Sequence, residues 1–146
     1  MRKRGLFGFI HALRGVADAV ACQRNLRVQL AAVVSVTVLG LTLRVDRASW
    51  GWLCLAFGLV LGLELCNTAL EILCDRVTRE RDEAIRQCKD IASAAVFVAV
   101  LAVLGVAVVV FGKPELWRAV SPVTLAVVGG LVLISDILFI FFGGKK

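Results

Sequence analysis

The sequence has 146 residues, a net charge of +6 and 60% hydrophobic residues, a balance that excludes an ordinary soluble domain. Lys and Arg stand at the ends of apolar segments, which favours anionic lipid headgroups over nucleic acid as the partner. Five cysteines without a CxxC pair, together with a single histidine, argue against a zinc site and for reduced thiols.

The N-terminal region predicts a helix lying on the membrane surface. Apolar residues recur every three or four positions between Leu6 and Val20, after a basic start at Arg2, Lys3 and Arg4. A basic amphipathic helix of this kind binds in the membrane interface, and a helix packed on a protein core is the alternative. No cleavable signal is expected, because the first apolar stretch has no uninterrupted hydrophobic core.

Four apolar segments then predict membrane spans. Residues 28–43 are uncharged, and this first span can begin near Arg24. The second starts at Trp50 and runs through an acidic stretch. The third covers residues 91–111 and the fourth residues 120–142. We therefore expect an all-α integral membrane protein with an N-terminal surface helix, three spans and an additional C-terminal span.

Finer expectations concern the contacts and turns of these spans. Charged residues at 76–88 predict a solvated turn. Gly58 and Gly62 form a GxxxG that permits close helix approach, and residues 93–95 supply small side chains for packing against the acidic helix. Asp136 is expected to pair locally or to extend toward the membrane surface.

The distribution of Lys and Arg predicts the orientation. Of the 17 basic residues, thirteen fall on the side that holds both termini and the 76–88 turn. The other side holds four, namely Arg44, Arg47, Lys113 and Arg118. By the positive-inside rule, both termini and the end of the acidic stretch are cytoplasmic.

The second span carries the most informative pattern. At about 100° per residue, one helix face holds five polar side chains: Glu64, Asn67, Thr68, Glu71 and Asp75. A carboxylate near the bilayer centre costs about 2.5–3.5 kcal/mol on insertion scales, and such residues mark functional sites by default. Hydrogen-bonded structural filler is the alternative, although one polar group would be enough for it.

These residue types suit a metal-bound phosphate beside a lipid alcohol. Carboxylates one or two helical turns apart suit Mg²⁺, which is often shared with substrate phosphates. Phosphoryl transfer also needs cations on the phosphates and a group that orients or deprotonates the acceptor. The sequence contains no GxxxxGK loop, so a nucleotide would be held by metal, Lys and Arg.

Two motifs resemble the prokaryotic diacylglycerol kinase family, which includes the undecaprenol kinases. The first is the run from Glu64 to Asp75, and the second is Lys89-Asp90-Ile-Ala-Ser93-Ala-Ala. The likeness runs from Arg4 to Phe111 and includes Gly15 and the Asn25-Leu-Arg27 context. It implies a diacylglycerol kinase-like membrane domain over residues 1–112, with residues 113–146 as an additional transmembrane helix.

The resemblance also implies an activity and its residues. The protein would be an ATP-dependent, Mg²⁺-requiring lipid kinase that phosphorylates diacylglycerol or undecaprenol. It would be a homotrimer in the bacterial inner membrane, with active sites between subunits. Glu64 would be the general base and Glu71 a metal ligand. ATP would be bound by Lys89, Asp90, Glu80 and Arg4, and the lipid by Asn67, Ser93, Arg27 and Asn25.

The sequence departs from the family pattern at two glutamines. Gln23 stands where the family usually has a second glutamate metal ligand, and Gln29 where some members have another acid. An amide oxygen binds Mg²⁺ more weakly than a carboxylate does. A non-catalytic homologue and an ion-conducting bundle are therefore the competing functions, although the ion carrier predicts broken helices or inverted repeats that are not seen.

Overall fold

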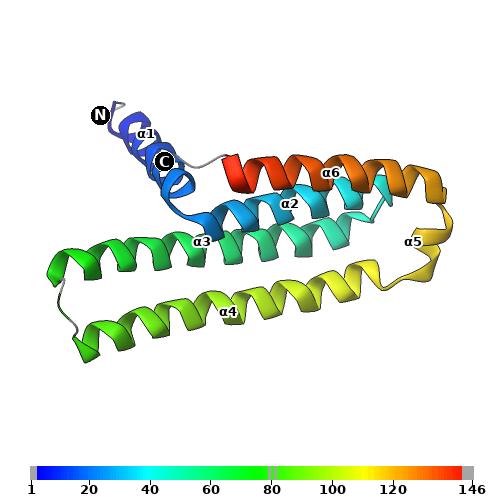
Figure 1. The fold of residues 1–146 in the computed structure, drawn as a ribbon. Helices are drawn as coiled ribbons and strands as arrows, with labels where there is room; N and C mark the ends of the chain where they lie inside the picture. Colours follow the sequence, from blue (N-terminus) through cyan, green and yellow to red (C-terminus); the bar gives the residue numbers. More distant parts are fainter. Residues whose placement is uncertain (1–2, 79, 81, 143–146) are drawn as a thin grey trace.

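The computed structural model describes residues 3–78, 80 and 82–142 and consists of helices joined by short turns (Figure 1). The helices are α1 (Lys3–Cys22), α2 (Arg24–Thr42), α3 (Arg47–Val77), α4 (Glu83–Phe111), α5 (Pro114–Arg118) and α6 (Pro122–Phe142). Four of them, α2, α3, α4 and α6, are long and apolar enough to cross a membrane. The predicted all-α, multi-pass membrane fold is confirmed, and α5 is a short helix that was not predicted.

The long helices pack as a row of antiparallel neighbours. α3 lies between α4 and α2, and α6 runs along the outer side of α2 (Figure 1). α1 stands at a steep angle to the others, beside the start of α2. Its apolar residues Phe9, Leu13 and Val16 are exposed, as suits a helix that lies in a membrane interface.

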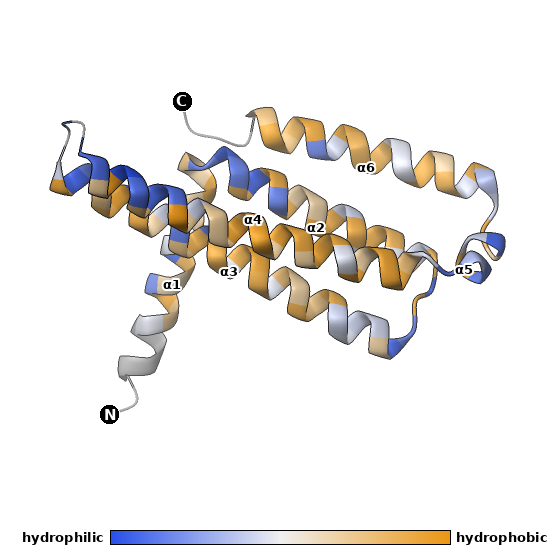
Figure 2. Cartoon of the chain, turned by 90° about the horizontal axis from the view of Figure 1, so that it is seen from below, coloured by the Kyte–Doolittle hydropathy of each residue, from blue (hydrophilic) through white to orange (hydrophobic). Residues whose placement is uncertain are grey.

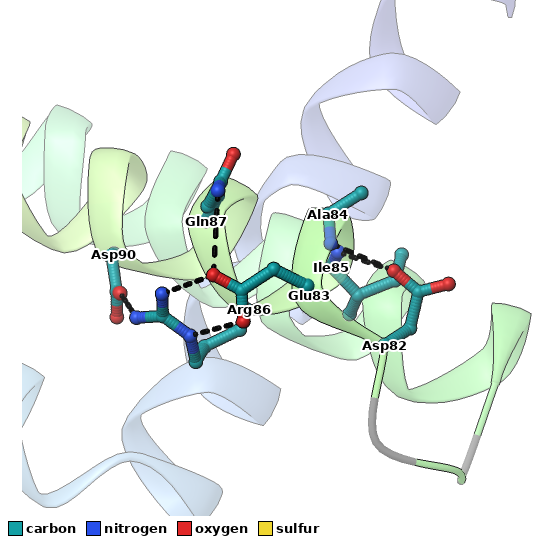
Figure 3. Close-up of polar contacts among 7 residues, drawn as sticks. All are labelled: Asp82, Glu83, Ala84, Ile85, Arg86, Gln87 and Asp90. Carbon is teal, nitrogen blue, oxygen red and sulfur yellow. Dashed lines mark hydrogen bonds and ion pairs between the residues drawn. The ribbon is translucent and has the colours of Figure 1, made fainter.

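Capping residues define the ends of the two longest helices. The carboxylate of Asp46 accepts hydrogen bonds from the Ser49 backbone N–H at 2.9 Å and its hydroxyl at 2.8 Å, which starts α3. Asp82 accepts from two backbone N–H groups at the start of α4 (Figure 3). Arg44 adopts a positive φ of 54°, which allows the tight turn between α2 and α3.

The predicted polar turn at 76–88 is wrong in extent. α3 continues to Val77 and α4 already begins at Glu83. Arg86 bridges Glu83 and Asp90 on the exposed face of α4, and such pairs one turn apart support a charged helical segment (Figure 3). Hydrophilic residues accordingly gather where α3 leads into α4, at the end of an otherwise apolar pair (Figure 2).

Helix length places this polar end outside the hydrocarbon. α3 has 31 residues and α4 has 29, which correspond to about 46 and 43 Å. A bilayer has a hydrocarbon core of about 30 Å, so both helices extend well beyond it. α2, with 19 residues, is about 28 Å long, and its N-terminal end lies beside the acidic stripe of α3.

The small residues that pack between helices are not those expected. Ser93 is exposed, as are the two alanines after it, whereas Ala92 and Ala99 are the buried small residues of α4. Gly58 and Gly62 have open space at their Cβ positions, so the GxxxG contacts no other helix within the chain. Gly40 does have a packing role, since a Cβ there would lie 3.0 Å from the Trp50 ring.

α6 is fixed to α2 by polar contacts within the membrane. The Ser35 hydroxyl donates to the Asp136 carboxylate, so Asp136 pairs across helices rather than locally. A carboxyl in an apolar helix is stabilised by any donor on the facing surface, and α2 provides one. Arg27 donates to the Ile140 carbonyl at 3.3 Å, and the Arg24 guanidinium lies 5.3 Å from the centre of the Phe141 ring.

Candidate functional site

The polar stripe of α3 faces the bundle as the helical period predicts. Glu64, Asn67 and Thr68 are buried, with only 3% of Glu64 exposed. Glu71 is half-buried, and Asp75 is exposed at the end of the helix. The stripe therefore leads from the membrane interior to the polar end of the molecule. Since seven residues span about 10 Å of helix, Glu64 and Glu71 are separated by roughly that depth.

Two glutamines of the α2 region hold these two glutamates. Gln29 Nε2 donates to Glu64 Oε2 at 2.7 Å, and Gln23 Nε2 donates to Glu71 Oε2 at 3.1 Å. The second oxygen of Glu71 accepts a hydrogen bond of 3.0 Å from Asn67 Nδ2. The predicted base Glu64 and the predicted metal ligand Glu71 are thus both fixed by neutral amide donors, and both positions where the sequence lacks an acid lie against them.

A groove of about 470 Å³ runs between α2, α3 and α4 from this polar end. Its polar lining consists of Glu64, Gln29, Asn25 and Ser93, while the remaining lining residues are Val, Ala, Phe and Leu. Because the apolar part lies along spanning helices, the groove suits a hydrocarbon chain whose polar group reaches Glu64. It brings together two predicted lipid contacts, Asn25 and Ser93, with the predicted base.

A second, polar cleft of about 670 Å³ lies at the turn between α3 and α4. Lys89 and Glu80 line it, together with Asp75 and Arg76. The Lys89 ammonium forms an ion pair with Asp75 across the two helices. Two of the predicted ATP ligands, Lys89 and Glu80, therefore share one water-accessible cleft.

Two predicted site residues lie elsewhere, and the side chain of a third is not described. Asp90 points to Arg86 on the exposed face of α4 and does not pair with its neighbour Lys89 (Figure 3). Arg27 is buried and donates to the carbonyls of Val20 and Ala21 at 2.9 and 3.3 Å, where it joins α1 to α2. The side chain of Arg4 lies outside the described residues.

The oxygen atoms around Glu71 determine whether Mg²⁺ fits this end of the stripe. Among residues 3–78, 80 and 82–142, no three His, Cys, Asp or Glu side chains form a metal-binding group. The Glu71 side chain supplies one carboxylate to this site. The amide oxygen of Asn67, the residue that donates to Glu71, is buried without a hydrogen-bond partner among the described residues. One carboxylate with neutral oxygens fits an ion that arrives bound to phosphates, because Mg²⁺ commonly binds proteins in this way.

Sequence reasoning left Gln29 out of the site and treated Gln23 only as a replaced metal ligand. The antiparallel register of α2 against α3 relates both positions to the acidic stripe. Moving six residues along α2, from 23 to 29, matches moving seven residues back along α3, from 71 to 64. Antiparallel neighbouring helices give this relation, so the two contacts follow once α2 and α3 are known to pack together.

Four helices long and apolar enough to cross a membrane, with a buried carboxylate at the polar end of an apolar groove, indicate a membrane protein with a functional acid where a lipid chain would fit. A sequence profile described as prokaryotic diacylglycerol kinase matches residues 10–111, and the chain therefore belongs to this family of lipid kinases. The family expected from the two sequence motifs is confirmed. Membership implies ATP as the phosphoryl donor.

Two relatives show how far the similarity extends. Undecaprenol kinase of Bacillus subtilis (strain 168) is 32% identical over 90 residues, which cover 62% of this chain and 73% of the relative. Diacylglycerol kinase of Synechocystis sp. is 37% identical over 98 residues, which cover 66% of this chain and 56% of the relative. No solved structure matches significantly.

Proposed function

We propose that this lipid kinase transfers the γ-phosphate of ATP to the hydroxyl of diacylglycerol, which gives phosphatidic acid. The observation that carries the proposal is Glu64, a carboxylate buried at the polar end of an apolar groove. A soluble alcohol needs no such groove, whereas a lipid hydroxyl would meet Glu64 with its acyl chains among the valines. The water-accessible end of the same stripe supplies the groups for the nucleotide.

Glu64 acts as the general base in this proposal. Its carboxylate accepts the proton of the lipid hydroxyl as the hydroxyl oxygen forms a bond to the γ-phosphorus and the bond to the ADP oxygen breaks. Asn25 and Ser93 line the groove beside it and can orient the lipid through hydrogen bonds. Asn67 keeps the next carboxylate in place through its 3.0 Å bond to Glu71.

The nucleotide end uses residues of α3, α4 and the turn between them. Mg²⁺ bound with ATP supplies charge neutralisation on the phosphates. Glu71 would be its protein ligand, and the Gln23 amide, which donates its N–H to Glu71 here, would act as a weaker second ligand only if its oxygen turned toward the ion. Lys89 leaves Asp75 to contact the phosphates, since that ion pair is partly exposed and exchanges easily. Glu80 and Asp90 at the same end, and Arg4, complete the proposed nucleotide ligands.

A polyprenol is the second candidate acceptor. The relative from Bacillus subtilis, whose printed name is undecaprenol kinase, is matched over 73% of its length, against 56% for the diacylglycerol kinase. The groove would receive the first isoprene units as readily as an acyl chain, because its apolar lining contacts hydrocarbon without distinguishing its branching. The two acceptors differ mainly in their tails.

We further propose a homotrimer in the bacterial inner membrane, with both termini cytoplasmic. The excess of Lys and Arg on the side of the termini supports the orientation. Gly58 and Gly62, which have open space at their Cβ positions among the described residues, offer a surface for close approach of another copy. Residues 1–112 would form the kinase unit and 113–146 an added helix that packs on its α2.

The experiment uses the full chain in nanodiscs with Mg²⁺, labelled ATP and either diacylglycerol or undecaprenol. We expect label in phosphatidic acid, and with Glu64→Gln only a residual rate lower by about 10²–10⁴-fold, the contribution typical of a general base. Glu115→Gln, the same change on the exposed short helix α5, is the matched control and should keep full activity. Label in undecaprenol alone would select the second candidate. Silence with both lipids would contradict the kinase proposal.

A further inference from the structure

Of the four polar residues that line the groove, Gln29 is the one to which the sequence motifs give no role in binding or catalysis. It is half-buried on α2, two turns into the first span, and its Nε2 lies 2.7 Å from Glu64 Oε2. When Glu64 is ionised, its carboxylate only accepts hydrogen bonds, so the Gln29 amide must face it with the NH₂ group, as it does in the structure. Among the described residues, this is the one hydrogen bond that the Glu64 carboxylate accepts.

The bond uses one carboxylate oxygen and leaves the other open. Glu64 Oε2 accepts from Gln29, while Oε1 accepts no hydrogen bond from the described residues. The Gln29 amide oxygen is itself buried without a hydrogen-bond partner among the described residues, and Gln29 is one of the residues that line the groove. Buried polar atoms without partners are rare and call for an explanation such as a ligand or a bound water.

We propose that Gln29 is a positioning residue, which holds Glu64 by one oxygen so that the other faces the lipid hydroxyl. The inference rests on the proposed function, since it assigns the free Oε1 to proton acceptance. Without the amide, Glu64 would be free to change rotamer in a groove that has room for it, and the base would spend less time in the productive geometry.

Gln29→Met tests the idea, because methionine keeps the length and lack of branching but has no N–H group. We expect kcat toward diacylglycerol to fall on the order of tenfold to a hundredfold, the loss typical of a misplaced catalytic group. The KM for ATP should stay unchanged. Gln87→Met, on the exposed face of α4, is the matched control and should keep the unmodified kcat.

A double variant separates positioning from general damage to the fold. If Gln29 acts only through Glu64, adding Gln29→Met to Glu64→Gln should cause no further loss in the residual rate. Full kcat in Gln29→Met beside an inactive Glu64→Gln would overturn this inference alone, as would a rise confined to the KM for lipid. Absence of transfer by the unmodified protein would overturn the proposed function and, with it, this inference.

Discussion

Gln23→Glu is the substitution whose outcome depends most directly on the charge at the proposed metal site. In the structure the Gln23 amide donates to Glu71 at 3.1 Å. A glutamate there would replace an attraction by two facing carboxylates. At an effective dielectric constant of 20, two unit charges 3.1 Å apart repel by about 5 kcal/mol.

Proton uptake limits this cost. Protonating a glutamate of ordinary pKa at pH 7 requires about 3.7 kcal/mol, so the pair would take up a proton rather than bear a larger repulsion. The destabilisation of the metal-free variant is therefore capped near that value. A divalent cation would remove the repulsion, because both carboxylates would then bind it.

The assay compares SDS unfolding midpoints of unmodified protein and Gln23→Glu in mixed micelles, with EDTA or with Mg²⁺ and a non-hydrolysable ATP analogue. We expect the variant to be less stable in EDTA and to gain more from Mg²⁺ than the unmodified protein. The Mg²⁺ concentration for half-maximal kinase activity should fall at least tenfold. Equal responses to Mg²⁺ in both proteins would refute the assignment of Glu71 and Gln23 to the metal.

Three further predictions test other contacts of the structure. Glu71→Ala should weaken binding of Mg²⁺ and nucleotide while leaving lipid binding intact, and an unchanged Mg²⁺ requirement in the kinase assay would count against its role. Ser35→Ala should lower the SDS unfolding midpoint by an amount equivalent to about 1 kcal/mol, since it leaves the Asp136 carboxyl unpaired in the membrane. Asp136→Leu should lower the midpoint less, because it removes the carboxyl as well. The reverse order would contradict this view of the α2–α6 contact. The Ser49 backbone N–H, followed by the Ser49 hydroxyl and Lys113, holds the pKa of Asp46 well below its usual value, so the carboxylate stabilises the fold at neutral pH and this contribution is lost as pH falls below about 4. Asp46→Asn caps the helix without titrating, and its SDS midpoint should change less than that of the unmodified protein between pH 5 and pH 2.

Periodicity and composition predicted the parts of the molecule that depend on one helix at a time. The four spans, the surface helix and the buried face from Glu64 to Glu71 all follow from residue spacing within a segment. A helix fixes the direction of its side chains every 100°, so no knowledge of the rest of the chain is needed to place them on a face. The limits of the polar turn were wrong because charge alone does not end a helix that has a cap at Asp82.

The partners of those faces came from the tertiary structure. Which helix covers the acidic stripe depends on the rotation and register of α2 against α3, and these are set by contacts between residues 35 or more positions apart. The same reason explains why Lys89 on α4 pairs with Asp75 on α3, 14 positions away, while Asp90 pairs within its own helix with Arg86. It also explains why Asp136 has its partner on α2, 101 positions away.

The sequence by itself thus determined that two acids of one membrane helix point inward, because burial of a helical face is a local property. Only the packed structure decided that the amide of Gln29 would meet the inner acid and that of Gln23 the outer one. A hydrogen bond between helices forms only when donor and acceptor are placed to within a few tenths of an ångström. The residue pattern along a single helix does not determine that placement.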